Sequence, residues 1–216
     1  KAATERRPRP SRQNPEKVRI TKEMITEMLE NKIIEKSVSP HNSRIVLVKK
    51  ASGGWRFCVD LRKVNAVMRP AKFPLPLLDE ILDAMGGAKY FTALDIQSAY
   101  NIVPLSEDSR PWTAFEIPQV GKFQFKTLAF GLQNSSAIFL LLLNLILEPL
   151  LFKGVAAYVD DLLIYSNTME EHIRILEDVL QRFRKYNLRI SAKKVQLIPS
   201  NVNFLGMDLS KEGVRP

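Results

Sequence analysis

Apolar positions along this chain follow two patterns. Short runs of apolar or alternating apolar and polar residues, which are typical of β-strands, are interspersed with longer segments in which apolar residues recur every three or four positions, as on one face of an α-helix. This mixture of hairpins and helices favours the α+β class. Helices are expected at 21–31, 77–85, 134–147 and 168–183, and strands at 45–50, 55–61, 90–96, 113–117, 123–125, 155–159, 162–165, 188–190 and 202–205.

Two of the expected helices carry start signals. Asn134 is expected to cap the third helix with its side chain, while Thr168 and Glu171 have the spacing of a capping box for the fourth. The apolar face of the fourth helix is expected to bury Ile173, Leu176, Val179, Leu180 and Phe183.

Two adjacent aspartates, Asp160 and Asp161, lie between the apolar runs 155–159 and 162–165. The runs predict two paired strands with the aspartates at the tip of the hairpin. Adjacent carboxylates repel each other, and taking them out of water is costly unless a positive charge lies beside them. A divalent cation would supply that charge, whereas a solvated acidic turn is the alternative interpretation.

Asp95 ends another apolar strand, 91–94, where an aspartate commonly only caps the next turn. If both strands belong to one sheet, Asp95, Asp160 and Asp161 could meet at one edge. Three carboxylates there could hold two Mg²⁺ ions about 3.5–4 Å apart, with Mn²⁺ as a substitute, for an in-line displacement at phosphorus. The sequence shows the carboxylates but not their convergence.

A second group of charged residues surrounds the hairpin expected at 45–61. Lys49 and Lys50 end its first strand, Gly53 and Gly54 form its turn, and Arg56 lies on its second strand. Arginine binds phosphate through two parallel hydrogen bonds and lysine binds it as a point charge, so this hairpin could clamp a triphosphate. Ordinary solvated surface charge is the alternative.

Composition narrows the classes of function. Of 216 residues, 45% are hydrophobic, which indicates a globular chain, and the net charge of +9 favours a polyanionic partner such as nucleic acid. The single cysteine, Cys58, excludes an internal disulfide and a cysteine-based zinc site, and His41 and His172 are too few for a histidine metal cluster. Catalysis would therefore depend on carboxylates, lysines, arginines and hydroxyls.

The ends and the most apolar segment indicate the setting. Residues 1–17 are rich in lysine, arginine and proline, which predicts a basic extended arm. No secretory signal is visible, and the apolar segment 137–152 is interrupted by Asn144, Glu148 and Pro149, short of the ~20 residues that cross a bilayer. An intracellular setting is expected, in the cytoplasm, a virus-like particle or the nucleus, with no membrane partner.

Five short motifs occur in order along the chain, at 55–62, 91–100, 130–132, 158–161 and 204–206. Together they resemble the reverse transcriptases of gypsy-like LTR retrotransposons and, more distantly, of retroviral-type Pol polyproteins. The resemblance covers nearly the whole chain from about residue 20. It implies an RNA-directed DNA polymerase, a nucleotidyltransferase that adds dNTPs to the 3′-hydroxyl of a template-bound primer.

The resemblance also implies roles for individual residues. Asp95, Asp160 and Asp161 match the catalytic metal-binding triad, with the backbone carbonyl of Ile96 as a further metal ligand. The remaining matches are Lys50 and Arg56 as contacts of the triphosphate, Tyr100 as the aromatic residue that excludes a ribose 2′-hydroxyl, Phe130 beside the nucleotide and template, and Gly206, Met207 and Asp208 in the primer grip. Lys193 and Lys194 would lie on the palm near the primer grip, or simply be solvated.

The implied architecture is the fingers and palm of a right-hand polymerase, with an antiparallel palm sheet packed on helices and no thumb. Residues 18–90 would be mainly fingers and 91–216 mainly palm, with 111–135 returning to the fingers, so that the sequence ends just after the primer grip. The thumb, connection and RNase H regions of the family would then be missing, and processive synthesis by this piece alone is not expected.

Two departures from the family pattern stand close together. After 130–132 the family usually has Asn, then Ala or Ser, then Pro, whereas this chain has Asn134-Ser135-Ser136. Polar residues usually follow Phe139, but here Leu140–Leu143 follow it, and some of these leucines should face outward. They suggest contact with a protein partner or a second copy, or else drift in a copy no longer selected for template binding. The alternative function is a domesticated, non-catalytic scaffold that binds protein or nucleic acid.

Overall fold

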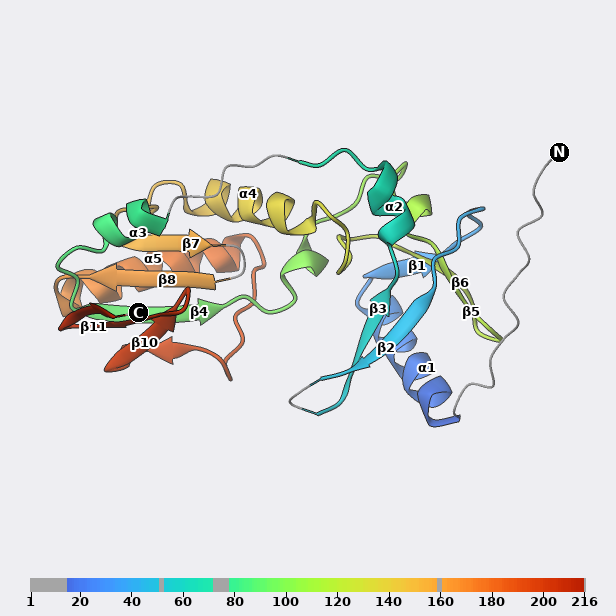
Figure 1. The fold of residues 1–216 in the computed structure, drawn as a ribbon, viewed down its shortest axis with the longest axis horizontal. Helices are drawn as coiled ribbons and strands as arrows, with labels where there is room; N and C mark the ends of the chain where they lie inside the picture. Colours follow the sequence, from blue (N-terminus) through green and yellow to red (C-terminus); the bar gives the residue numbers. More distant parts are fainter. Residues whose placement is uncertain (1–14, 51–52, 72–77, 159–160, 216) are drawn as a thin grey trace. The chain divides into compact units, whose positions relative to one another are not determined.

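The structure, a computed structural model, describes residues 15–50, 53–71, 78–158 and 161–215. The chain divides into two compact units (Figure 1). Unit 1 comprises Lys1–Val64 and Leu105–Lys126, and unit 2 comprises Asn65–Pro104 and Thr127–Pro216. Each unit is formed by segments that are far apart in the sequence, and each is described by itself below.

Unit 1 contains a helix, a three-stranded sheet and a hairpin. Helix α1 (Pro15–Glu30) begins within the segment expected to be an extended arm, and the residues before it lie outside the described part. Strands β1 (Ile34–Lys36), β6 (Gly121–Phe125) and β5 (Phe115–Ile117) form an antiparallel sheet, while β2 (Ile45–Lys49) pairs with β3 (Trp55–Val59). Residues 113 and 114 do not extend β5, because Arg110–Thr113 form a 3₁₀ turn, η2. The core of the unit is Phe115, which is fully buried against Phe57, Phe123 and Phe125.

Unit 2 is organised around a four-stranded antiparallel sheet. Its order is β7 (Val155–Tyr158), β8 (Asp161–Ser166), β4 (Tyr90–Asp95) and β9 (Gln196–Leu197). A second sheet contains β10 (Asn201–Phe204), β11 (Met207–Ser210) and β12 (Gly213–Arg215). The helical elements are α2 (Arg62–Val67), which crosses the boundary between the units, α3 (Leu78–Ala84), the 3₁₀ helix η1 (Ala99–Ile102), α4 (Ser135–Leu147) and α5 (Met169–Lys185).

The two faces of the main sheet pack against different elements. Successive side chains of a strand alternate between faces, and Phe91 on β4 and Leu163 and Tyr165 on β8 join a core with α3, β10 and β11. On the opposite face, Thr92 and Ser166 meet α5. Among the described residues, no helix is both long and apolar enough to cross a membrane.

Three local expectations differ from the structure. Asn134 precedes α4, but its side chain makes no capping hydrogen bond there. Residues 188–190 form only an isolated bridge, Ile96 to Ile190, rather than a strand. Helix α5 buries His172, Ile175, Val179 and Phe183, whereas Ile173 and Leu180 are exposed. The buried face is centred on His172 and Val179, so Ile173 and Leu180 lie to one side of it. One half of the capping box is confirmed, because the Thr168 hydroxyl accepts a hydrogen bond from the Glu171 amide at 3.2 Å. In the other half, the Glu171 carboxylate accepts from the amide of Asn167 instead of that of Thr168.

His172, expected to be an isolated histidine, is 0% exposed and joins α5 to the sheet. Ser166 donates its hydroxyl hydrogen to the Thr168 carbonyl (2.9 Å), so it accepts from His172 Nδ1 (3.0 Å). His172 Nε2 is then the acceptor of the Thr92 hydroxyl hydrogen (2.8 Å), and Thr92 in turn accepts from the Ile198 amide. The network assigns a neutral imidazole with its proton on Nδ1.

Stability should fall in mild acid because of His172. Burial lowers the pKa of its imidazole below the ordinary 6.5, so the unfolded chain binds the proton more tightly than the folded one. The contribution of His172 is complete above pH 6.5 and is lost as the pH falls from there towards the folded pKa, with a slope of at most about 1.4 kcal/mol per pH unit. Urea unfolding followed by circular dichroism between pH 7.5 and 5 should show this slope. His41→Gln should keep it and His172→Gln should reduce it; an equal slope in all three proteins would contradict the assignment.

Gly154 should be difficult to replace. It has a φ of +115°, and a Cβ atom there would collide with Ile175 Cδ1 and lie 3.3 Å from the Tyr165 carbonyl oxygen. Gly154→Ala is therefore expected to cost about 2–4 kcal/mol of unfolding free energy, from backbone strain and overpacking together. Gly213→Ala is the matched control, because its φ is +130° and nothing lies within 4 Å of its added Cβ. Equal costs in the two variants would contradict the steric part of the argument.

Candidate metal and nucleotide site

Asp95 and Asp161 face each other across the β4–β8 pair, where they are directly opposed in the register. Asp95 shares a face with Phe91 and Ala93, and Asp161 shares it with Leu163 and Tyr165, because side chains alternate along each strand. Both aspartates therefore lie on the face of the sheet that packs against β10 and β11. Alternation and register together bring the two carboxylates to one place, a convergence that the sequence alone does not show.

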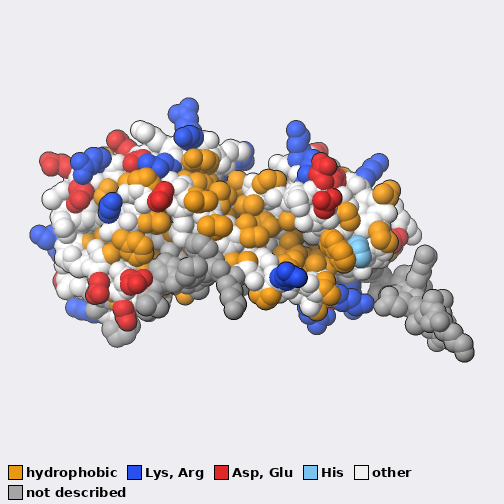
Figure 2. Space-filling model, turned by 90° about the horizontal axis from the view of Figure 1, so that it is seen from above, with side chains coloured by type: hydrophobic (Ala, Val, Ile, Leu, Met, Phe, Trp, Pro, Cys, Tyr) orange, Lys and Arg blue, Asp and Glu red, His pale blue; other side chains and the backbone are white. Residues whose placement is uncertain are grey.

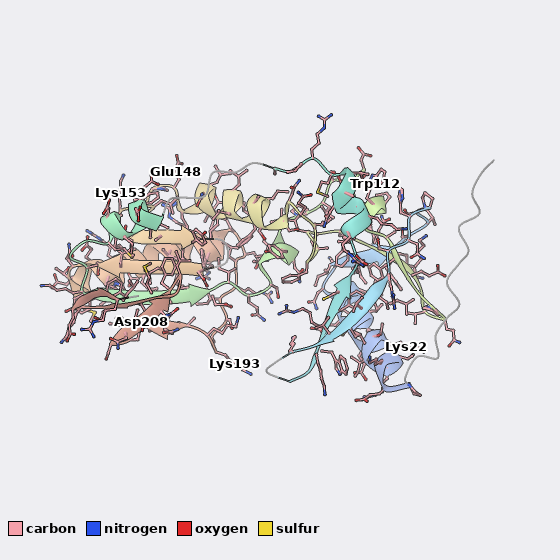
Figure 3. The ribbon with its side chains drawn as sticks, in the orientation of Figure 1. Lys22, Trp112, Glu148, Lys153, Lys193 and Asp208 are labelled. Carbon is pink, nitrogen blue, oxygen red and sulfur yellow. The ribbon has the colours of Figure 1, made fainter. Side chains whose placement is uncertain are left out.

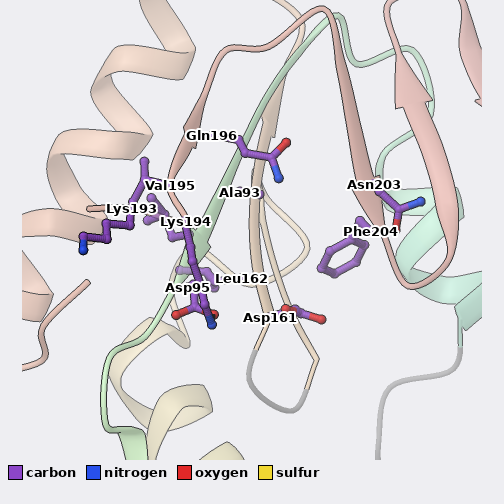
Figure 4. Close-up of a pocket in the computed structure, with 11 residues that line it drawn as sticks. Ala93, Asp95, Asp161, Leu162, Lys193, Lys194, Val195, Gln196, Asn203 and Phe204 are labelled. Atoms are coloured by element: carbon purple, nitrogen blue, oxygen red, sulfur yellow. The ribbon is translucent and has the colours of Figure 1, made fainter. Parts of the chain in front are cut away.

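A cavity of about 390 Å³ opens beside this pair (Figure 4). The turn before β9 forms one wall and β10 another. Lys194, in that turn, places its Nζ atom 2.8 Å from Asp95 Oδ2. The lining residues are Ala93, Leu94, Asp95, Asp161, Leu162, Lys193, Lys194, Val195, Gln196, Asn203 and Phe204.

Backbone hydrogen bonds hold the turn of Lys194 against the end of β4. The Ser191 amide donates to the Asp95 carbonyl (2.9 Å), and the Gln97 amide donates to the Arg189 carbonyl (2.7 Å). Lys193, the neighbouring lysine, is exposed and points away from Asp95 in Figure 4, and it projects from the loop in Figure 3. Only Lys194 of this pair forms an ion pair with Asp95 among the described residues.

The electrostatics of the pair favour a cation. Partial burial raises the pKa of Asp161, the negative charge of Asp95 raises it further, and the positive charge of Lys194 opposes both effects. A cation would stabilise the charge of Asp161, and the two carboxylates together form a set of oxygen donors that fits Mg²⁺.

The other predicted metal ligands are less well defined. Asp160 lies outside the described residues, and no group of three metal-binding side chains gathers within the described part of the chain. Ile96 follows Asp95 directly, is buried and bridges to Ile190. The complete ligand set therefore stays a prediction.

Tyr100 and Phe130 lie together in unit 2. Their ring centroids are 4.8 Å apart in an edge-to-face arrangement, and Phe139 of α4 approaches Tyr100 from another direction, at 6.1 Å. Tyr100 is 6% exposed and Phe130 is 49% exposed. The Tyr100 hydroxyl lies 2.8 Å from the hydroxyl of Ser136, in the first turn of α4.

Two asparagine side chains hold the loop that carries Phe130. Asn65 donates to the Gly131 carbonyl (2.7 Å) and accepts from the Gln133 amide (2.9 Å). Asn134 likewise donates to the Arg69 carbonyl and accepts from the Ala71 amide, both at 2.9 Å. This use of its amide explains why Asn134 does not cap α4. Each asparagine side chain satisfies one donor and one acceptor of the backbone, and these hydrogen bonds hold the loop in a defined conformation.

Lys50 and Arg56 belong to unit 1 and flank the turn of the β2–β3 hairpin. The Lys50 amide donates to the Gly54 carbonyl at 3.1 Å, and Arg56 lies opposite Val48 in the register. Both side chains are exposed.

The predicted primer-grip residues form a tight hairpin between β10 and β11. Leu205 and Gly206 both have positive φ, 55° and 80°, as the two central residues of a type I′ turn require. Asp208 on β11, labelled in Figure 3, accepts a hydrogen bond of 2.9 Å from Asn203, and Met207 pairs with Phe204.

Helix α4 carries an apolar stripe on its outer side. Leu140 and Leu143 are buried, while Leu141 and Leu145 are 42% and 64% exposed. Figure 2 looks onto the side of unit 2 that carries α4 and shows hydrophobic side chains gathered there. The expectation that some leucines face outward is confirmed, and contact with a partner or second copy through this helix stays a prediction.

Sequence reasoning missed the contacts that hold the site together. Lys194 could not be distinguished from the solvated Lys193, because the two are adjacent and chemically identical. Ser136 stands out in the sequence only as a departure from the family pattern, and no sequence pattern points to Asn65. The one signal available for Asn134 was its place before a helix, which suggested the wrong partner.

Comparisons with known proteins identify the family of the chain. A family model described as "Reverse transcriptase (RNA-dependent DNA polymerase)" matches residues 48–209. The Drosophila melanogaster Pol polyproteins of transposons 297 and gypsy are 34% and 35% identical, over 89% and 88% of this chain. A Schizosaccharomyces pombe Tf2 polyprotein is 31% identical over 94%. The chain spans only 18%, 19% and 15% of the lengths of these relatives.

Solved structures of a foamy viral protease–reverse transcriptase are also similar. One, in complex with double-stranded DNA, has a TM-score of 0.84 at 28% identity and covers 98% of this chain and 44% of its own. Another, in complex with an RNA/DNA hybrid, has a TM-score of 0.83 at 28% identity and covers 96% of this chain and 28% of its own. Because the family model matches most of the chain and the relatives exceed 30% identity over almost all of it, the chain belongs to the reverse transcriptase (RNA-dependent DNA polymerase) family.

Proposed function

We propose that this chain is the polymerase core of an RNA-directed DNA polymerase. The primer 3′-hydroxyl oxygen attacks the α-phosphorus of a dNTP, a new P–O bond forms, and pyrophosphate leaves. The observation that carries the proposal is the opposed pair Asp95 and Asp161, which lies on one sheet face beside a cavity and within motifs of the family.

Asp95, Asp160 and Asp161, with the Ile96 carbonyl, would hold two Mg²⁺ ions or their Mn²⁺ substitutes. Bound there, the ions would activate the attacking hydroxyl and stabilise charge at the phosphorus. The task of the chain is to keep the carboxylates charged and oriented. The β4–β8 register supports this role because it orients Asp95 and Asp161 before any ligand arrives.

Four residues are proposed to contact the nucleotide. Lys50 and Arg56 suit the triphosphate because both cations are exposed beside a hairpin turn. Tyr100, packed against Phe130, suits the sugar, since a rigid ring at the 2′ position excludes ribose. Phe130, half exposed, would lie beside the nucleotide and template.

The proposed partner is a template–primer duplex. Foamy viral relatives bind double-stranded DNA and an RNA/DNA hybrid, and the net charge of +9 suits the same polyanion here. Gly206, Met207 and Asp208 would contact the primer from the β10–β11 hairpin. We propose that unit 1 is mainly fingers and unit 2 mainly palm; the first unit combines Lys1–Val64 with Leu105–Lys126, whereas the family resemblance predicts 18–90 and 111–135 in the fingers.

Primer extension tests the proposal. On an RNA template with Mg²⁺, the chain within its polyprotein should extend a DNA primer, and Asp95→Asn, Asp160→Asn and Asp161→Asn should each lower the rate at least about 100-fold, since metal stabilisation of the transition state is worth several kcal/mol. Glu212→Gln removes a carboxylate of an exposed turn that pairs with Arg215, and should leave the rate unchanged. Extension that survives all three aspartate substitutions would exclude this site, and no extension by the parent would favour the non-catalytic scaffold.

Metal binding should compete with Lys194. Its ammonium group lies 2.8 Å from Asp95 Oδ2, so Lys194→Met should tighten Mn²⁺ binding about twofold to fivefold, the range for an exposed ion pair. Lys193→Met is the control, because it removes one positive charge from the neighbouring position without breaking the ion pair with Asp95. Electron paramagnetic resonance of free Mn²⁺ measures the affinity directly. Equal affinities in the two variants would argue against a cation site at Asp95.

A further inference from the structure

Ser136, in the first turn of α4, contacts the residue proposed to select the sugar. Its Oγ atom is 2.8 Å from the Tyr100 hydroxyl oxygen, a good distance for a hydrogen bond between two hydroxyls.

The position of Ser136 is itself well determined. Ser135, the preceding residue, is buried and donates its hydroxyl hydrogen to the Ala129 carbonyl at 2.9 Å. The Asn134 side chain forms hydrogen bonds with the backbone of residues 69 and 71. The two residues before Ser136 are therefore held by hydrogen bonds to other segments of the chain. These bonds fix the backbone from which the Ser136 hydroxyl projects.

The Tyr100 ring has complementary restraints. Phe130 and Phe139 lie at centroid distances of 4.8 and 6.1 Å from it, and both contacts are edge-to-face. Edge-to-face packing is a geometry that aromatic pairs prefer, so it restrains the tilt of the ring. A hydrogen bond at the far end of the ring is directional as well, so it adds a restraint at the hydroxyl group.

We infer that Ser136 is a positioning residue for sugar selection, whose hydroxyl holds the Tyr100 ring against the space that a ribose 2′-hydroxyl would occupy. The inference rests on the proposed polymerase function and deepens it. A ring that cannot swing aside discriminates by exclusion, and a ring released at its hydroxyl end accommodates the extra oxygen. Loss of the contact should therefore admit ribonucleotides and leave deoxynucleotides nearly unaffected.

The test is a comparison of discrimination ratios in the full polyprotein. Ser136→Ala should lower the ratio of kcat/KM for dATP to that for ATP about threefold to tenfold, the range for one lost hydrogen bond, mainly through a lower KM for ATP. Ser136→Thr keeps a hydroxyl and should restore the ratio. Ser136→Pro should behave as Ser136→Ala, because proline is tolerated in the first turn of a helix, and this variant separates the effect from misfolding.

A double-mutant cycle separates positioning from general stability. Tyr100→Phe keeps the ring and removes the hydroxyl, so in its background Ser136→Ala should cause no further change in the ratio. Additive effects of the two substitutions would contradict the inference. The resonance of Tyr100 in protein labelled with 13C at tyrosine Cζ should shift in Ser136→Ala and not in Ser136→Thr.

Discrimination can also be measured without chemistry. The ratio of dissociation constants for dATP and ATP, determined with template–primer and Ca²⁺, should change in Ser136→Ala in the same direction. A changed binding ratio in a protein that extends no primer would support Ser136 and refute the polymerase proposal. Normal extension with unchanged ratios would refute Ser136 and leave the polymerase proposal standing.

Discussion

The antiparallel pairing of β4 with β8 is the constraint on which unit 2 depends. Its register sets Asp95 opposite Asp161, and the alternation of side chains then assigns both to one face. A slip of one residue would move one carboxylate to the opposite face, among the contacts of α5. The same register buries Leu163 and Tyr165 in the core with α3, β10 and β11, so the packing that stabilises the sheet also orients its acidic edge.

Around this edge, short polar contacts hold irregular backbone in place. Lys194 offsets the charge of Asp95, the amides of Asn65 and Asn134 bind the loop of Phe130, and the Ser136 hydroxyl holds that of Tyr100. None of these contacts contributes much to stability alone. Together they determine where charged and aromatic groups lie, which is what a site for phosphoryl chemistry requires.

Long-range pairing explains where prediction from sequence succeeded and where it failed. The hairpins at 45–59 and 155–166 were predictable because adjacent strands pair locally. The placement of β9 beside β4 was not, since about a hundred residues separate them. For α5, hydrophobicity alone selected Ile173 and Leu180, whereas the fold buries the polar His172, because Thr92 and Ser166 satisfy both of its nitrogens.

The sequence by itself determined the mixed helix and sheet class and the family, because strand periodicity and motif order are local properties of the chain. Only the tertiary structure decided which of two adjacent lysines meets Asp95, which partner Asn134 chooses and that Ser136 reaches Tyr100. These choices depend on distances between segments that are 36 to 99 residues apart, and no local pattern encodes such distances.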